Sequence, residues 1–155
     1  MAAVTPFPAA SSRTSERSVA LRVHPELPLL LLGPGVIAQQ LTDTPIAPIP
    51  NCTRWFCGVA RHGGQIVPFF DVALWAGIER SGRGMPVMVS ITAGTHSLGV
   101  LASESPIILP PGHAVAPWPD KNRLAADGPK PGTAIRFDPL AWLAEIATQI
   151  TSGPS

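Results

Sequence analysis

The sequence is short of charge and of long hydrophobic runs, and each shortage excludes a class of protein. Only 14% of its 155 residues are charged, and the net charge is +1. Two lysines, Lys121 and Lys130, and scattered arginines form no stripe that could neutralise a run of phosphates, so we expect no nucleic-acid binding. No segment approaches the roughly 20 apolar residues that cross a bilayer. The N-terminus also lacks the basic start and apolar run of a secretory signal. The sequence therefore predicts a cytoplasmic protein without direct membrane insertion.

Cysteine is also scarce, which excludes a disulfide framework. Cys52 and Cys57 suit a reducing compartment, where thiols stay free. Together with His62 they are evenly spaced by five positions, whereas zinc sites usually have two to four residues between paired cysteines and need a fourth ligand. The other histidines, His24, His96 and His113, lie in no ligand pattern either. We therefore predict no metal site, with one buried thiol and one loop thiol.

The abundance of apolar residues, proline and glycine indicates a mainly β protein. Apolar residues make up 45% of the chain, while 19 prolines and 14 glycines interrupt any long helix. The apolar residues come in bursts of strand length, at residues 19–23, 27–32, 55–60, 66–70, 87–91, 98–102, 107–109 and 134–137. Hairpins are predicted around Gly63-Gly64 and Ala93-Gly94. Because Pro68 cannot donate to a ladder, its strand is expected at an edge or bulged.

A short internal repeat predicts two strand-to-helix units. Phe70-Asp71 matches Phe137-Asp138, and in each copy a tryptophan follows the aspartate by four residues, Trp75 and Trp142. Each aspartate fits a helix N-cap, and a proline directly after the second fits the first helical position. The apolar spacing extends the last helix to about Ile150. One unit per lobe would give two small barrels of related build.

The sequence holds no assembled catalytic constellation. The stretch from Gly94 to Gly99 resembles a nucleophile elbow, but Thr95 occupies a position that requires glycine, and a strand rather than a helix follows. A small hydrolase or ligand-binding barrel that uses His96 and Ser97 is therefore the alternative. It would require these two side chains and a carboxylate to converge in one pocket.

Residues 50–78 resemble the central signature of the CheW-like family, roughly P-x(4)-W-x-x-G-V-x-x-x-R-G-x-x-V-P-x-x-D-L. The matching positions are Pro50, Trp55, Gly58, Val59, Gly64, Val67, Pro68 and Asp71. The likeness continues through residues 86–101 and the unit at Asp138. The resemblance implies two intertwined, SH3-like five-stranded β-barrels with short helices, formed by residues 17–150. Residues 1–16 and 151–155 are expected to be tails, the first of them disordered.

The resemblance also implies a function. Members of the family are non-enzymatic adaptors of bacterial chemosensory arrays, which couple the cytoplasmic tip of a chemoreceptor to the regulatory domain of a CheA-type histidine kinase, without a cofactor. Control of type IV pili or twitching motility would be one such pathway. By position, the kinase-facing segment would include Gln39 and Gln40. The receptor-facing groove would comprise Ile37, Gly58, Arg61, His62 and Gly63.

The chain departs from the family pattern at two places. The family carries an arginine directly before the hairpin glycine, where this chain has Gly63, with Arg61 two positions earlier. Strand alternation would place Arg61 on the same face as position 63, so Arg61 is the expected substitute. Residues 119–132 are polar where the family usually has a further apolar strand, which leaves the second barrel short of a strand.

Overall fold

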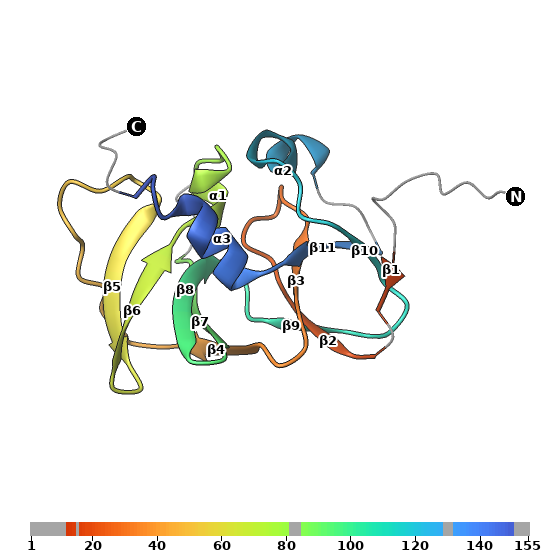
Figure 1. Ribbon diagram of the computed structural model, residues 1–155, viewed down its shortest axis with the longest axis horizontal. Helices are drawn as coiled ribbons and strands as arrows, with labels where there is room; N and C mark the ends of the chain where they lie inside the picture. The colour runs from red at the N-terminus through yellow and green to blue at the C-terminus, as the bar shows by residue number, and fades with distance from the viewer. Residues whose placement is uncertain (1–11, 15, 81–84, 129–131, 151–155) are drawn as a thin grey trace, which may run out of the picture.

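The computed structural model describes residues 12–14, 16–80, 85–128 and 132–150, which form two curved β-sheets and three short helices (Figure 1). Sheet A has the strand order β1 (Ser12–Arg13), β10 (Ala114–Ala116), β11 (Thr133–Phe137), β3 (Leu29–Leu32), β2 (Ser18–Leu21) and β9 (Ile107–Leu109). Sheet B has the order β4 (Ile37–Leu41), β7 (Val87–Ala93), β8 (His96–Ala102), β6 (Gln65–Phe70) and β5 (Phe56–His62). The helices are α1 (Val72–Trp75), α2 (Lys121–Asp127) and α3 (Pro139–Ile146). The chain thus starts in sheet A, builds sheet B and returns to complete sheet A.

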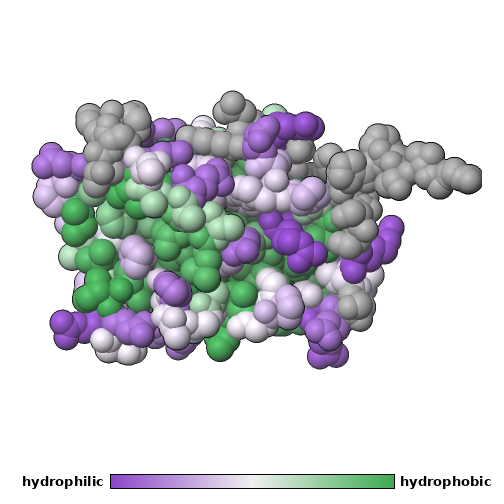
Figure 2. Space-filling model, in the orientation of Figure 1, coloured by the Kyte–Doolittle hydropathy of each residue, from purple (hydrophilic) through white to green (hydrophobic). Residues whose placement is uncertain are grey.

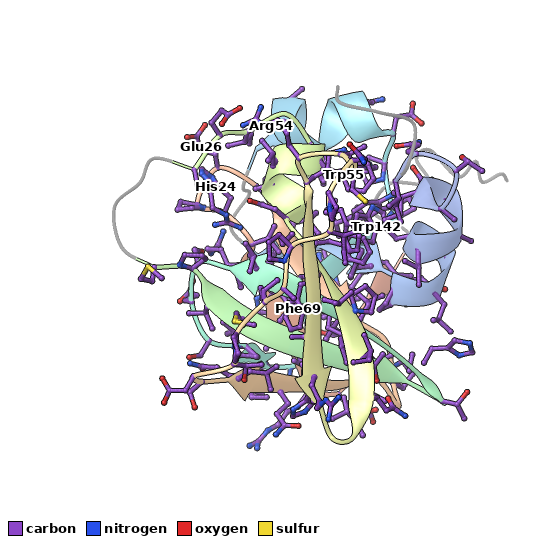
Figure 3. All side chains as sticks on the ribbon, turned by 90° about the vertical axis from the view of Figure 1, so that its left-hand side faces the viewer. His24, Glu26, Arg54, Trp55, Phe69 and Trp142 are labelled. Carbon is purple, nitrogen blue, oxygen red and sulfur yellow. The ribbon has the colours of Figure 1, made fainter. Side chains whose placement is uncertain are left out.

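Each sheet curls around a small apolar cluster. In sheet A the cluster joins residues of β2, β3, β9, β10 and β11, so the strands at both sides of the sheet reach the same centre. In sheet B it contains Leu41, Ala60, Val67 and Phe69, and Figure 3 shows Phe69 within the curve of the strands. Two backbone hydrogen bonds between Ala47 and Val59 tie the segment after β4 to β5, which closes sheet B. The expected pair of intertwined barrels is confirmed in outline.

The main hydrophobic core lies between the two sheets and under the helices. It includes Leu30 and Leu32 from sheet A, Val89 and Val100 from sheet B, and Trp142 from α3. Because strand residues alternate between faces, each sheet supplies one face to this common core and the other to its own cluster. The two lobes therefore fold around shared apolar surface.

The repeat forms as predicted. Asp71 Oδ1 accepts a hydrogen bond from Leu74 N at 3.1 Å, which caps α1. Asp138 Oδ1 accepts from Leu140 N at 3.1 Å and caps α3. The two tryptophans of the repeat, Trp75 and Trp142, meet edge-to-face with ring centroids 5.6 Å apart. The two units thus pack against each other at the centre of the core.

Both predicted hairpins are present, and the prediction for Pro68 was wrong in part. The turns lie at Gly63-Gly64 and at Gly94-Thr95. However, β6 lies between β5 and β8 rather than at an edge. Pro68 pairs with Val59, whose own N–H and C=O bond Ala47 on the other side of β5. The missing N–H of Pro68 therefore points toward β8, and pairing of β6 with β8 begins only at Phe69.

Other expectations need correction. Sheet A has six strands rather than five, because Ser12–Arg13 pairs with β10; these residues fall within the expected tail 1–16. The polar stretch expected to leave the second barrel short contains α2 instead of a strand. Helix α3 ends at Ile146, and the carbonyl of Ile150 accepts a hydrogen bond from Thr53 N instead of continuing the helix. Residues 1–11 and 151–155 lie outside the described residues.

Candidate functional site

Three of the predicted site residues gather at one end of sheet B. Ile37 and Gln39 are two positions apart on β4, so their side chains lie on the same face of the strand. The Nε2 atom of His62, at the end of β5, lies 3.3 Å from Gln39 Oε1. Ile37 is 64% exposed although it is a large apolar residue. An apolar side chain and a polar pair thus form the open end of the sheet B barrel.

Arg61 lies on the opposite face of the same hairpin from His62. Its cross-strand partner is Ile66 of β6, which is 60% exposed. Within the described residues Arg61 forms no ion pair. The predicted receptor-facing residues therefore do not converge on one surface: His62 faces the barrel end, and Arg61 faces outward.

Gly63 belongs to the hairpin turn and not to the strand. Strand β5 ends at His62, and Gly63 and Gly64 have φ values of +60° and +77°. Two positive φ values are typical of the tight turn that suits the twist of a two-residue hairpin, and they favour glycine. The alternation argument that placed Arg61 and position 63 on one face is therefore wrong. An arginine at position 63 of this hairpin would be held in a strained conformation.

Gly58 is buried and has a structural reason to be glycine. Its φ is +133°, and a Cβ atom at this position would lie 2.3 Å from the carbonyl oxygen of Ala47. This close approach is the contact that closes sheet B. Gly58 thus shapes the barrel from within and offers no side chain to a partner.

Gln40 points away from Gln39. Its Oε1 atom accepts a hydrogen bond from Ser105 Oγ, in the segment that leads from β8 to β9. The two glutamines of the predicted kinase-facing segment therefore have different neighbours. Gln39 belongs to the barrel end with His62, and Gln40 bonds to the connection toward sheet A.

Sequence reasoning missed the apolar surface beside Arg61. Cross-strand neighbours share a face, so Ile66 and the pair Val59–Pro68 line the outer face of the β5–β6 hairpin. Leu140 of α3 is a further exposed apolar residue. Figure 2 shows hydrophobic side chains gathered over β5, β6 and the region toward α3. The sequence contained a signal for this surface. In a strand that buries Val67 and Phe69, the alternation of side chains turns Ile66 and Pro68 outward.

The geometry required by the hydrolase alternative does not form among the described residues. Ser97 Oγ lies 2.9 Å from Thr92 Oγ1 on the neighbouring strand, and His96 Nδ1 lies 3.4 Å from Thr95 Oγ1. His96 and Ser97 are consecutive in β8, so they point to opposite faces. The described part of the chain also contains no group of three or more histidine, cysteine or acidic residues that could hold a metal ion.

Cys57 is a poor nucleophile in this setting. Burial, and to a lesser extent the nearby Asp71 carboxylate, raise the pKa of its thiol from 9.0 to about 12, against a smaller lowering by the Arg80 guanidinium. Cys52 lies in the loop before β5, and both cysteines are free thiols. This arrangement favours a packing role for Cys57 over a catalytic one.

A polar clip near Cys57 joins the two sheets. Arg80 Nε donates to Asp71 Oδ2 at 3.1 Å. Its terminal NH2 group donates to the carbonyl oxygens of Val23, after β2, and of Leu101, on β8. One guanidinium thus links sheet A, sheet B and the cap of α1.

Among the described residues, no helix is long and apolar enough to span a membrane.

Comparison with known proteins gives the same fold. Residues 35–108 match the family model of the CheW-like domain, which confirms the resemblance drawn from the sequence. The crystal structure of the scaffolding protein TtCheW from Thermoanaerobacter tengcongensis is similar, with a TM-score of 0.51 at 19% sequence identity. The similarity covers 62% of this chain and 65% of that chain, so this chain spans just under two thirds of the length of TtCheW. No curated protein matches the chain significantly.

Proposed function

We propose that residues 17–150 act as a non-enzymatic, cytoplasmic adaptor of a chemosensory array, such as one that controls type IV pili, because residues 35–108 match the family model of the CheW-like domain. The adaptor would bind the cytoplasmic tip of a chemoreceptor and the regulatory domain of a CheA-type histidine kinase. The observation that carries the proposal is the placement of Ile37, Gln39 and His62 together at an exposed barrel end within the matched residues.

The outer face of the β5–β6 hairpin supports a helical receptor partner. Ile66 supplies exposed apolar area, and Arg61 directly opposite it, which has no ion pair in the described part of the chain, supplies a cation at the rim. An amphipathic helix of the receptor tip, with acidic residues beside its apolar stripe, would match this surface. Arg61 would act here from its own strand position, since Gly63 offers no side chain.

The kinase contact would use the β4 side of the barrel end. Gln39 and His62 hydrogen bond to each other, so the two predicted surfaces are adjacent at this pair. Removing Arg61, on the other face, should leave the kinase contact unchanged. The two partners can therefore be tested separately on one protein.

The test is a titration of the purified chain with a receptor-tip fragment and with a CheA-type regulatory domain from the same bacterium. Arg61→Ala should weaken receptor binding by roughly 5- to 100-fold, the range for an interface arginine that matters, and leave kinase binding unchanged. Arg54→Ala is the matched control, because Arg54 is an exposed arginine paired with Glu79 outside this surface. Failure of the unmodified chain to bind either partner would refute the proposal.

A further inference from the structure

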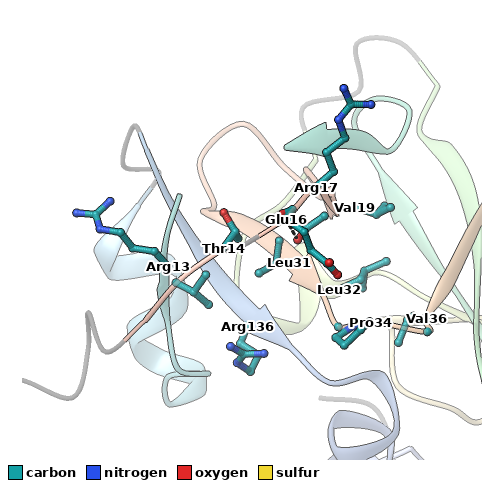
Figure 4. Close-up of a pocket in the computed structure, with 14 residues that line it drawn as sticks. Arg13, Thr14, Glu16, Arg17, Val19, Leu31, Leu32, Pro34, Val36 and Arg136 are labelled. Atoms are coloured by element: carbon teal, nitrogen blue, oxygen red, sulfur yellow. Dashed lines mark hydrogen bonds between the residues drawn. The ribbon is translucent and has the colours of Figure 1, made fainter. Parts of the chain in front are cut away.

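A hollow of about 400 Å³ lies at one end of sheet A, away from the hairpin that carries Arg61. One wall is formed by Arg13, Thr14 and residues 16–19, and the other is the end of β3 with the turn through Val36 (Figure 4). Val115 and Arg136 complete the lining. Its size lies within the range of protein binding pockets.

The hollow is lined by apolar side chains together with the exposed Arg136. In β11, Arg136 alternates with Ile135 and Phe137, which face the main core. Arg136 is paired in register with Leu31, which belongs to the apolar cluster inside sheet A. The guanidinium therefore rises from the inner, apolar face of the barrel, where strand alternation alone would favour a hydrophobic residue.

The hollow carries unbalanced positive charge. Its lining contains three arginines, Arg13, Arg17 and Arg136, and one acidic residue, Glu16, which leaves a net charge of +2. The ion pairs among the described residues all join other arginines, namely Arg22, Arg54 and Arg80, to their acidic partners. The cations around the hollow thus have no carboxylate partner in the described chain.

The N-terminal wall is held in place by a dense set of hydrogen bonds. Thr14 N donates to the His113 carbonyl at 2.8 Å, and Gly112 N donates to the Thr14 carbonyl at 2.8 Å. His113 N donates to Thr14 Oγ1 at 2.9 Å, and Arg13 bonds the carbonyl of Gly112. The wall is therefore a built part of sheet A, and the hollow is formed before a ligand arrives.

We propose that this hollow binds a peptide segment of a partner protein in which acidic residues alternate with apolar ones. In Figure 4 the guanidinium groups of Arg13 and Arg17 stand on different sides of the hollow, so they suit separate carboxylates better than one small anion. In an extended segment every second side chain lies on one face, roughly 7 Å apart. Such a segment can place apolar side chains over the partly exposed Val19 and Val36 while carboxylates on its other face reach the arginines at the sides of the hollow.

The test uses two acetylated and amidated five-residue peptides, one alternating glutamate with leucine and the other alternating glutamine with leucine. Binding to the full chain is measured by calorimetry at low salt. The glutamate peptide should bind, the glutamine peptide should bind at least tenfold more weakly, and added salt should reduce the difference. Arg136→Gln should reduce glutamate-peptide affinity about tenfold or more.

Arg123→Gln is the matched control, because Arg123 is an exposed arginine of α2 outside this hollow. It should bind the glutamate peptide as the unmodified chain does. Circular dichroism and thermal melting verify that Arg136→Gln folds. Equal affinity for the two peptides, no binding of either, or unchanged binding by Arg136→Gln would each overturn the proposal.

Discussion

The two strand–aspartate–helix units have the same local structure and very different surroundings. Asp71 is buried, and while one of its carboxylate oxygens caps α1, the other accepts a hydrogen bond from Arg80. Asp138 is exposed, and the hydrogen bonds of its carboxylate to other described residues all cap α3. The local motif therefore sets the helix start in both copies. The position of Asp71 between the sheets gives it an additional hydrogen bond from Arg80. This contrast between the two units can be tested by substitution.

The shared centre of the two units should give the largest effect. Trp142 is 2% exposed and packs against Trp75, Phe70 and Phe137. Trp142→Ala should lower the free energy of unfolding by about 3–5 kcal/mol, the usual cost of deleting a buried tryptophan. Trp75→Ala should cost a similar amount if the copies share one core. Urea unfolding measures both, and a large loss for one variant alone would show that the units pack independently.

The Arg80 clip should distinguish the first unit from the second. Arg80→Met leaves the Asp71 carboxylate and two backbone carbonyls without their donor, so we expect a loss of about 2–3 kcal/mol in unfolding free energy. Asp71→Asn in the same chain should recover part of this loss, because the buried charge is then removed. A loss from Arg80→Met below 0.5 kcal/mol, on the order of a surface ion pair, would contradict the clip.

The sequence could predict what depends on local pattern. The two hairpins, both aspartate caps and the paired tryptophans follow from alternation, turn glycines and repeat spacing. Strand β4 was missed because two exposed glutamines interrupt its apolar pattern, and β10 because its sequence, Ala-Val-Ala, contains a single large apolar residue. The donors and acceptors of the Arg80 clip come from distant segments, and two of its acceptors are backbone carbonyls, which no side-chain pattern reveals.

The candidate site was predictable to a similar extent. Sequence position placed Gln39 and His62 in the site, but only the closure of sheet B brings their side chains together. Gly58 was chosen as a contact residue, yet the approach of Ala47 gives it a structural reason to be glycine. The hollow around Arg136 escaped prediction because Arg136 lies far in the sequence from Arg13 and Arg17.

The exposed cap should give a modest effect. Asp138→Ala removes the acceptor of the Leu140 and Ala141 backbone N–H groups, and we expect a loss of about 1 kcal/mol in unfolding free energy. Asp138→Asn keeps an acceptor oxygen and should restore most of that loss. Thermal melting follows both variants. An unchanged melting temperature in Asp138→Ala would mean that α3 is held by Trp142 and Ile146 alone.

The smallest effect concerns Cys57, which reports the electrostatics of the first unit alone. Its folded-state pKa of about 12 lies above the ordinary value of 9.0, so the folded chain favours the protonated thiol. The resulting contribution to stability is fully present below about pH 9 and is lost as the pH rises toward 12.

At pH 8 the thiolate fraction of Cys57 should be roughly a thousandfold below that of an ordinary cysteine. Alkylation with iodoacetamide, followed by mass spectrometry, should therefore modify Cys52 long before Cys57 in the folded chain. In urea both thiols should react alike, which controls for intrinsic reactivity. Arg80→Met removes the group that lowers the Cys57 pKa, so labelling of a still-folded variant should not be faster. Equal labelling of the two cysteines in the folded chain would show that the first unit is open to solvent, and the contrast between the buried and the exposed aspartate would then fail.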